Sequence, residues 1–313
     1  MINRFQSCIL LILSSLSLTA TSLPDWLDPQ VFEKNREPMH TTFNLHPNNL
    51  HRLGLGGIWK FNFSEQAEGR PTDFYKISYD DSCWGSIPVP GIWELNGYGD
   101  PVYTSRNYAW EGNYKNNPPY PPTERNHVGQ YRRIFNLHDR WAGKDIFLHI
   151  GSAISNVRVW INGKEVGYSE DSKLEARFNI TDFLKAGENL IALEIFRWCD
   201  GTYLEDQDMW RLSGIARDVY ISAREKKRFE DIRVSGSADG TVSLSAIVSK
   251  GVTSVSYEII SPEGKVASSG TIPVKTASGM KTASQTVQIP APLLWTAETP
   301  WLYQLRVTAY DSK

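Results

Sequence analysis

The residues from Arg197 to Ile215, RWCDGTYLEDQDMWRLSGI, combine carboxylates with aromatic rings in one short stretch. The carboxylates are Asp200, Glu205, Asp206 and Asp208, and the rings are Trp198, Tyr203 and Trp210. Carboxylates accept hydrogen bonds from hydroxyl groups, and flat rings suit the apolar faces of sugars. The combination indicates carbohydrate chemistry, although the same residue types also suit a well-packed corner of a β-sandwich.

The carboxylates of this stretch are poorly arranged for a catalytic pair. A retaining glycosidase needs two carboxyl groups about 5–5.5 Å apart, one an acid and one a nucleophile. Asp206 and Asp208 would share a face only on a strand, and nothing nearby would separate their pKa values. We therefore favour a structured loop with a tight turn at Asp200-Gly201. The later carboxylates would cap backbone N–H groups or pair with arginines, namely Arg197, Arg211 and Arg217.

The composition predicts a folded globular protein of about two domains. The chain has 313 residues, 41% of them hydrophobic and 22% charged. The formal net charge of −2 gives no electrostatic reason for nucleic-acid binding. We find no Gly-rich phosphate loop, zinc motif or nucleophile elbow. Nothing points to a Ser/His/Asp grouping, although sequence alone does not exclude one.

The first 22 residues have the pattern of a secretory signal peptide. Arg4 precedes a short apolar run, Cys8 to Leu18, and small residues follow it. The run is shorter than the ~20 residues of a membrane span. We expect a secreted or periplasmic bacterial protein without a membrane span. Cleavage would leave Cys83 and Cys199, which could pair or stay as two thiols.

Short strands separated by turn residues dominate residues 54–224. Residues 23–53 are polar and turn-rich, and we expect them to wrap over the surface of this domain as an extended segment. The long loop 96–128 is rich in Tyr and Trp, which argues for order. Asn162-Gly163 is a strong hairpin signal, and residues 87–90 suit a sheet edge because of their prolines. No long amphipathic helix interrupts the series, so we predict a jelly-roll sandwich. The main expected strands are 57–63, 129–137, 145–150, 157–161, 164–168, 190–196 and 216–222.

A second series of strands follows a charged linker at 223–228. It matches an immunoglobulin-like sandwich, which has about seven strands. We count about five, and the sequence stops at a turn without a return strand. We therefore expect residues 225–313 to form a truncated immunoglobulin-like domain. The expected strands are 229–235, 240–248, 254–260, 284–289 and 303–310.

The sequence resembles the N-terminal region of glycoside hydrolase family 2 β-galactosidases of the long, multi-domain type. The resemblance covers nearly the whole mature chain, and the stretch 197–215 is its most specific part. Arg217-Asp-Val219 follows that stretch. Other matching runs, in chain order, are Trp26-x-Asp-Pro29, Leu55-Gly-Gly-Ile-Trp-Lys-Phe61, Val89-Pro-Gly-Ile-Trp93, Pro101-Val-Tyr-Thr104, Val166-Gly-Tyr168 and Ala186-Gly-Glu-Asn189.

The resemblance implies roles for particular residues. Asp200 matches a family aspartate that contacts the galactosyl hydroxyls and helps to ligate sodium. A family asparagine that also touches the sugar is replaced here by Ser105, with Asn107 two places on, so either is a candidate for that contact. The remaining matched positions shape the loop and pack it on a catalytic barrel: Trp198, Glu205, Asp206, Asp208, Trp210 and Arg211.

The family's catalytic glutamates lie on a (β/α)₈ barrel of about 250 residues, for which this sequence has no room. We expect an all-β chain: a galactose-binding-like jelly roll, an incomplete immunoglobulin-like sandwich and no TIM barrel. It would be the inactive front of a retaining β-galactosidase, with the catalytic part, magnesium and any homo-oligomer contacts elsewhere. Two alternatives stay open. One is a stand-alone carbohydrate-binding module, and the other is the front of a related β-glucuronidase or β-mannosidase.

Overall fold

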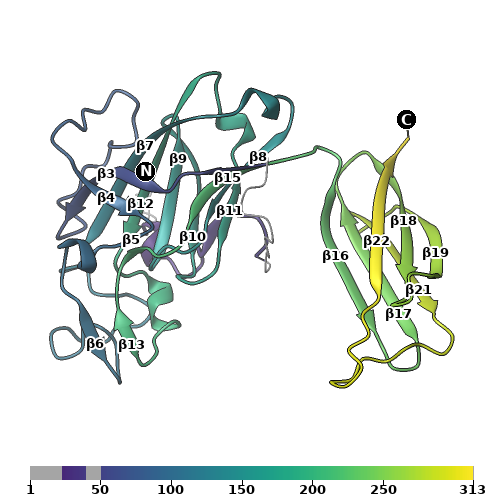
Figure 1. Ribbon diagram of the computed structural model, residues 1–313. Coiled ribbons are helices and arrows are strands. Elements are labelled where there is room, and N and C mark those ends of the chain that lie inside the picture. Colours follow the sequence, from purple (N-terminus) through teal and green to yellow (C-terminus); the bar gives the residue numbers. More distant parts are fainter. Residues whose placement is uncertain (1–22, 40–50, 313) are drawn as a thin grey trace, which may run out of the picture.

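A computed structural model describes residues 23–39 and 51–312 and shows two β-sandwiches joined by a short linker (Figure 1). The expected signal peptide, residues 1–22, lies outside the described residues. Within the described ranges no helix is long and apolar enough to cross a membrane. The described part is built of strands and short 3-10 turns, and it holds no (β/α)₈ barrel. The prediction of an all-β chain is confirmed.

The first sandwich packs a seven-stranded sheet against a four-stranded sheet. The larger sheet has the order β1-β10-β9-β12-β7-β3-β4. These strands are β1 (Glu33–Lys34), β10 (Lys164–Glu170), β9 (Asn156–Ile161), β12 (Glu188–Phe196), β7 (Val128–Asn136), β3 (Gly57–Ser64) and β4 (Gly85–Val89). The smaller sheet contains β11 (Ala176–Asn179), β8 (Asp145–Ile150), β15 (Val219–Arg224) and β2 (Arg52–Gly54).

Short ribbons and single turns connect the strands of this sandwich. The ribbons are β13 (Met209–Arg211) with β6 (Val102–Thr104), and β14 (Gly214–Ile215) with β5 (Gly91–Ile92). The turns are η1 (Asp25–Leu27), η2 (Glu94–Asn96), η3 (Asp139–Trp141), η4 (Thr181–Phe183) and η5 (Asp200–Tyr203). Ribbon β6–β13 carries much of the stretch that suggested carbohydrate chemistry.

The core of the first sandwich explains why these strands form. Trp59 and Phe61 on β3 alternate with exposed residues, as a half-buried strand requires. Strand β12, in the middle of the larger sheet, is buried at every position after Glu188. The two inner faces meet in one cluster that includes Trp93, Tyr131 and Phe178. This closed core holds the end of β12 in place. The turn that begins at Asp200 comes shortly after β12 in the chain.

Several local predictions are confirmed. Asn162 and Gly163 have φ of 51° and 81°, and they join β9 to β10 in a tight hairpin. β4 is an edge strand, as its prolines indicate. The long loop contains one short strand, β6, and buries Trp110 with 1% exposure. Its aromatic residues therefore serve to pack it.

The segment before the first long strand does more than cover the surface. β1 adds a strand to the edge of the larger sheet by pairing with β10. Trp26 is buried and stacks on Phe196, with ring centroids 4.8 Å apart. The expected surface segment thus contributes to both a sheet and a small core.

The second sandwich has seven strands rather than the five we counted. The four-stranded sheet contains β16 (Phe229–Gly236), β17 (Thr241–Val248), β21 (Met280–Gln288) and β20 (Lys275–Ala277). The three-stranded sheet has the order β19-β18-β22, with β19 (Val266–Pro273), β18 (Val252–Ile260) and β22 (Gln304–Asp311). The count was wrong because β19 is rich in Ser and Gly and β20 is a three-residue edge strand, so neither shows an apolar alternation.

The two cysteines do not pair. Cys83 is exposed and Cys199 is buried, and both are free thiols. Burial raises the pKa of the Cys199 thiol well above its usual value. The alternative of two thiols, which the sequence left open, is the one that the structure adopts.

Candidate functional site

Asp200 is the first residue of η5, four residues after the end of β12. The 3-10 turn closes through the N–H of Thr202, which donates to the Cys199 carbonyl at 3.0 Å. The Thr202 hydroxyl accepts from the Cys199 N–H at 3.0 Å. The turn is therefore rigid, and it holds Asp200 with only 9% of its surface exposed.

Asp200 has a carboxylate oxygen, Oδ1, that is buried and has no hydrogen-bond partner among the described residues. Ligand atoms of Glu170, Cys199 and Asp200 all lie within 4.8 Å of one another. Glu170 is the last residue of β10 and accepts a hydrogen bond from the Tyr168 hydroxyl at 2.8 Å. The carboxyl groups of Glu170 and Asp200 thus lie close together in a buried site beside the Cys199 thiol. The Oδ1 atom of Asp200 has no hydrogen-bond partner among the described residues.

This environment changes the protonation of both carboxyl groups. Burial raises the pKa of Glu170 to about 8, and the neighbouring Asp200 charge adds to the effect. Burial also raises the pKa of Asp200. Two carboxylates this close do not both ionise readily. The pair therefore holds either a shared proton or a cation near neutral pH.

A hard cation fits these groups chemically. Carboxylate oxygens are the ligands that such cations prefer, and a thiol is not. The unpartnered Oδ1 of Asp200 and the carboxylate of Glu170 are the two groups that would hold the ion, and a bound positive charge would offset their repulsion. Sequence reasoning named Asp200 for sodium but missed Glu170. The alternation of β10 could have found it, because Glu170 lies on the same strand face as Val166 and Tyr168, which are both buried.

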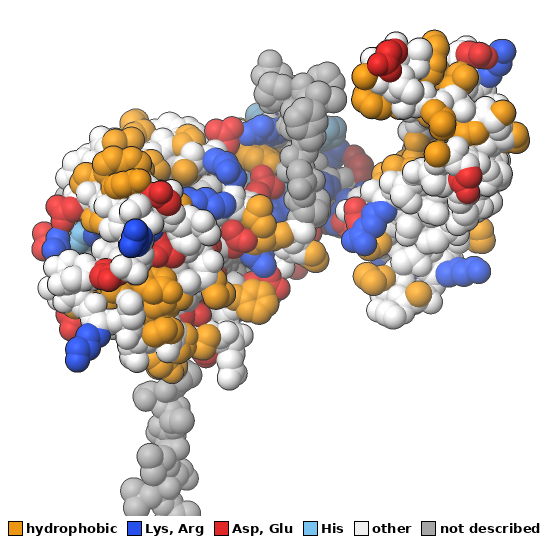
Figure 2. Space-filling view, turned by 90° about the horizontal axis from the view of Figure 1, so that it is seen from below, with side chains coloured by type: hydrophobic (Ala, Val, Ile, Leu, Met, Phe, Trp, Pro, Cys, Tyr) orange, Lys and Arg blue, Asp and Glu red, His pale blue; other side chains and the backbone are white. Residues whose placement is uncertain are grey.

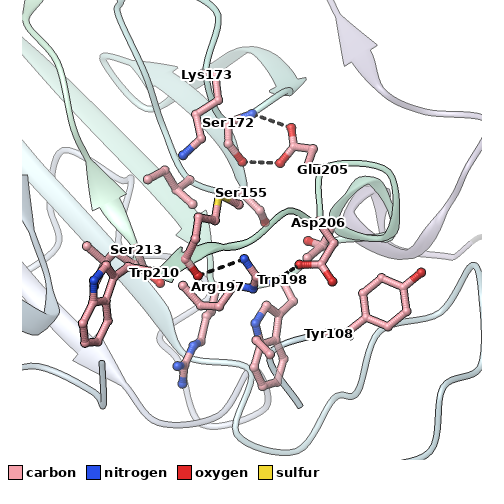
Figure 3. A pocket seen from close by; sticks show the side chains of 16 residues that line it. Tyr108, Ser155, Ser172, Lys173, Arg197, Trp198, Glu205, Asp206, Trp210 and Ser213 are labelled. Carbon is pink, nitrogen blue, oxygen red and sulfur yellow. Dashed lines mark hydrogen bonds and ion pairs between the residues drawn. The ribbon is translucent and has the colours of Figure 1, made fainter. Parts of the chain in front are cut away.

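Next to this turn, several of the predicted loop residues line a small pocket of about 50 Å³ (Figure 3). Glu205 points to Ser172 and accepts from its N–H at 2.7 Å and from its hydroxyl. Burial raises the pKa of Glu205. The volume suits water and excludes a sugar ring. The predicted residues that meet here are Trp198, Glu205, Asp206, Trp210 and Arg211, whereas Asp200, Asp208, Ser105 and Asn107 are not in the lining.

Arg211 connects the pocket to the loop after β6. It forms an ion pair with Asp206 and donates to the main-chain oxygens of Met209 at 3.1 Å and Asn107 at 3.3 Å. Its Nε is buried and has no hydrogen-bond partner within residues 23–39 and 51–312. The expectation that Asp206 pairs with an arginine is confirmed, and so is the capping role of Glu205. Arg197 and Arg217 donate to main-chain oxygens instead.

The ribbon β6–β13 presents the remaining predicted residues to solvent. Asp208 accepts from the Tyr103 hydroxyl at 2.7 Å, and the Tyr103 ring lies 5.4 Å from that of Trp210. Asn107 has a left-handed φ of 63°, which Asn tolerates well. Ser105 and Asn107 are exposed on the turn directly after β6. Asp206 and Asp208 precede β13 rather than lying on it, and they have different partners, so they do not form a catalytic pair.

Trp198 and Arg197 form the buried support of the site. Trp198 packs edge-on against Trp110, with centroids 5.1 Å apart. Its main chain pairs with the Asn126 side chain at 2.9 and 3.0 Å. Arg197 lies against His127, and burial, with this positive charge beside it, lowers the pKa of His127 to about 4. The imidazole is therefore neutral at physiological pH and has a structural role.

The structure also contains a Ser–His–Glu arrangement that sequence reasoning did not find. His149 Nδ1 lies 2.9 Å from Glu175 Oε1, and its Nε2 lies 2.7 Å from the Ser222 hydroxyl. Tyr220 stacks on the imidazole at 4.2 Å and covers it. Ser222 lies on β15, which pairs with β8 on one side and β2 on the other, so its main chain is part of the sheet. We interpret the arrangement as a structural network of the sheet.

Hydrophobic side chains form patches on the face of the first domain seen from below, the end that carries β6 and β13 (Figure 2). Exposed large residues of this end include Leu95, Tyr103, Tyr120, Leu204 and Trp210. Leu204 is 90% exposed although it directly follows η5. A surface of this kind, next to a buried polar site, is typical of a face that another part of a protein covers.

The described chain is thus a jelly roll that carries this site, followed by an immunoglobulin-like sandwich. Residues 53–224 match the family described as "Glycosyl hydrolases family 2, sugar binding domain", and residues 218–313 match "Glycosyl hydrolases family 2". The chain belongs to glycosyl hydrolase family 2.

The similar curated proteins are β-galactosidases. The chain is 36% identical to a β-galactosidase of Priestia megaterium over 310 residues, which are 91% of this chain and 30% of the relative. It is 35% identical to that of Halalkalibacterium halodurans, again over 91% of this chain and 30% of the relative. It is 32% identical to a β-galactosidase large subunit of Leuconostoc lactis, covering 92% of this chain and 49% of that subunit.

Solved structures support the fold. A calcium-binding mutant of Bacteroides uniformis β-glucuronidase 2 matches with a TM-score of 0.63 and 24% identity, over 83% of this chain and 30% of that chain. The chain thus spans about 30% of the length of the first relatives, which agrees with the N-terminal portion of such an enzyme.

Proposed function

We propose that this chain is the N-terminal part of a retaining β-galactosidase and supplies the Asp200 turn to an active site on a separate catalytic barrel. The identity to β-galactosidases over 91% of the chain supports the substrate class. The proposed role of Asp200 is supported by its Oδ1 atom, which is buried and has no hydrogen-bond partner among the described residues. A carboxylate kept in this state costs free energy unless something binds it. A sugar hydroxyl or a sodium ion would provide that partner.

The rest of the stretch would position this turn. Glu205 holds η5 to Ser172, and Arg211 holds the loop of Ser105 and Asn107 beside β13. The exposed end with Tyr103, Leu204 and Trp210 would pack against the barrel. The 50 Å³ pocket is too small for a sugar, so the chain alone would not enclose the substrate. The expected magnesium and any homo-oligomer belong to the proposal for the whole enzyme.

Complementation tests this function. The catalytic part of the Priestia megaterium relative, lacking its matched region, is mixed with this chain and a chromogenic β-galactoside. Neither part alone should turn over the substrate, and the mixture should. Asp200→Ala should lower kcat/KM by at least a hundredfold, whereas Asp208→Ala, on the exposed ribbon, should lower it less than threefold. Turnover by the isolated chain, abolished by Asp200→Ala, would disprove the assignment as a non-catalytic part.

The same experiment also tests the two alternatives, a related β-glucuronidase or β-mannosidase and a stand-alone carbohydrate-binding module. Beta-glucuronidases are among the solved structures with this fold, so β-glucuronide and β-mannoside substrates are assayed in parallel. Preferential turnover of either would replace galactoside as the substrate. Titration of the isolated chain with lactose tests a stand-alone carbohydrate-binding module. Micromolar affinity would favour that module, and affinity weaker than ten millimolar would support the front of an enzyme.

Sodium binding at Asp200 is tested separately. We expect sodium, but not equimolar lithium at constant ionic strength, to raise the melting temperature of the first domain. Asp200→Asn should abolish this difference. An equal response of the Asn variant would remove the sodium assignment and leave the sugar contact untouched.

A further inference from the structure

The connector between the two sandwiches, residues 225–228, is short and highly charged. It follows the last residue of β15 and ends directly before β16 (Figure 1). Its sequence, Glu-Lys-Lys-Arg, has the composition of a linker that repels itself and extends. Domains that share no large apolar interface are expected to move relative to one another. The contacts of Arg228 argue against such motion here.

The main chain of Arg228 is fixed to the second sandwich. Its N–H donates to the Ser249 hydroxyl at 2.8 Å, and its carbonyl accepts from the Ser249 N–H at 3.0 Å. The same hydroxyl donates to the carbonyl of Lys226 at 2.8 Å. Ser249 directly follows β17, whose last residue, Val248, pairs with Phe229. The end of the connector is therefore an extension of the β16–β17 pairing.

The side chain of Arg228 reaches back to the first sandwich. Its Nη1 donates to Asp145 Oδ2 at 2.7 Å, and Asp145 is the first residue of β8. The same Nη1 donates to the carbonyl of Glu225 at 2.9 Å, so the connector is folded rather than extended. Nε and Nη2 contact the carboxylate of Glu230 on β16, at 3.1 and 2.9 Å. One guanidinium group thus joins a carboxylate of each sandwich.

An aromatic ring of the first sandwich packs beside this contact. Phe147 lies on β8 between Ile146 and Leu148, which belong to the core, so its ring is on the outer face of the smaller sheet. Phe147 nevertheless has no exposed surface. The guanidinium groups of Arg224 and Arg228 lie 4.1 and 5.2 Å from its ring centre. The contact therefore combines paired charges with a covered aromatic ring.

Partial burial makes this ion pair stronger than an ordinary surface pair. The side chains of Arg228 and Asp145 are 15% and 24% exposed. Exposed pairs contribute little because solvent and salt screen them, whereas charge-assisted hydrogen bonds are shorter and stronger than neutral ones. A second ion pair joins Glu225 of the connector to Lys144, which directly precedes Asp145. Both ends of the connector are thus held to the start of β8.

We propose that Arg228 is an interdomain clamp that holds the two sandwiches in one fixed orientation, so that they move as a single rigid body. The clamp needs the planar fork of arginine, because Nη1 serves Asp145 while Nε and Nη2 serve Glu230. A lysine would keep the charge without contacting both carboxylates in this geometry. The residues of the clamp lie within 144–249, between the first sandwich and the first two strands of the second. The proposal does not depend on the substrate of the proposed enzyme.

Spin labels on the two sandwiches test the clamp by double electron–electron resonance. Glu188→Cys on β12 and Thr286→Cys on β21 provide exposed attachment sites, in a Cys83→Ser background. Cys199 is buried and should remain unlabelled. We expect a single narrow distance distribution in the parent chain. Arg228→Gln should at least double the width of this distribution, and Arg228→Lys should widen it as well.

Matched variants separate the clamp from a change of charge. Arg233→Gln removes the same charge from an exposed pair with Asp231 inside the second sandwich, and it should leave the width unchanged. Asp145→Ala should broaden the distribution as Arg228→Gln does, and the double variant should be no broader than either single variant.

Circular dichroism establishes that each labelled variant is folded, and Asp145→Ala provides the same test from the first sandwich if Arg228→Gln does not fold. A broad distribution in the parent chain would overturn the proposal. So would a width that stays unchanged in Arg228→Gln and Asp145→Ala. None of these readouts depends on glycosidase activity.

Discussion

The two sandwiches of this chain bury their inner faces to different extents. In the first, inward residues such as Val159 and Ile191 are fully buried, and the buried polar atoms without a hydrogen-bond partner among the described residues include Asp200 Oδ1. In the second, Val234 faces inward and is 56% exposed. The closed core of the first sandwich holds a buried polar site at its end, whereas the inner face of the second is partly exposed along β16.

A matched pair of substitutions tests this contrast most strongly. Val159→Ala in the first sandwich should destabilise its domain by about 2 kcal/mol, because it removes buried methyl groups and leaves a cavity. Val234→Ala in the second should cost no more than about 0.5 kcal/mol, because half-exposed methyl groups lose little. Denaturant unfolding with a domain-specific probe measures both. Equal losses of unfolding free energy in the two variants would show that the Val234 side chain is buried in solution.

The support of the site gives a smaller effect. Glu205→Ala should destabilise the first domain by about 1–2 kcal/mol, because the buried Ser172 N–H and hydroxyl lose their acceptor. Asp208→Ala, whose partner Tyr103 is exposed, should cost about 0.5 kcal/mol or less. Thermal unfolding compares the two variants. A larger loss of stability for Asp208→Ala than for Glu205→Ala would show that the β6–β13 ribbon stabilises the domain more than the contacts of Glu205 do.

Opposite pH dependences should come from two buried groups of the first domain. The pKa of His127 is about 4 in the folded chain and 6.5 when exposed, so the unfolded state binds more protons between these values. Stability should therefore be full above pH 6.5 and fall as the pH drops towards 4. His127→Gln should flatten this decline, as followed by melting temperature against pH. If His127→Gln left the decline in melting temperature between pH 6.5 and 4 unchanged, the His127 imidazole would have to be exposed to solvent.

Glu170 should act in the other direction. Its pKa is about 8 in the folded chain against 4.5 when exposed, so the folded state binds more protons in this window. Stability should fall as the pH rises from 4.5 through 8, in sodium-free buffer. Glu170→Gln should remove this slope and leave the His127 limb intact. A steeper slope in the Gln variant would contradict the shared burial of the two carboxyl groups.

A substitution at Asp200 itself should separate stability from activity. Asp200→Asn should be neutral or stabilising by up to about 1 kcal/mol at pH 8, because it removes a buried charge without a partner. The same variant should lose the galactosidase activity of the complemented enzyme. Loss of stability together with activity would instead indicate a structural role for the carboxylate.

Much of this architecture follows from local residue patterns. The Asn162-Gly163 turn, the alternation of β3 and the prolines of β4 act over a few residues, so the sequence alone determined a hairpin, a half-buried strand and a sheet edge. The order of motifs, above all RWCDGTYLEDQDMWRLSGI, determined the family. Strands β19 and β20 were missed because Ser, Gly and Lys carry no period that marks a strand.

Tertiary structure alone decided which groups meet. Glu170 and Asp200 are 30 residues apart in the sequence and share one buried place because β10 and the end of β12 converge there. Glu205 caps Ser172, and Arg211 pairs with Asp206, for the same reason. Local periodicity determines the strands of this chain, and long-range packing determines the protonation of its buried carboxyl groups.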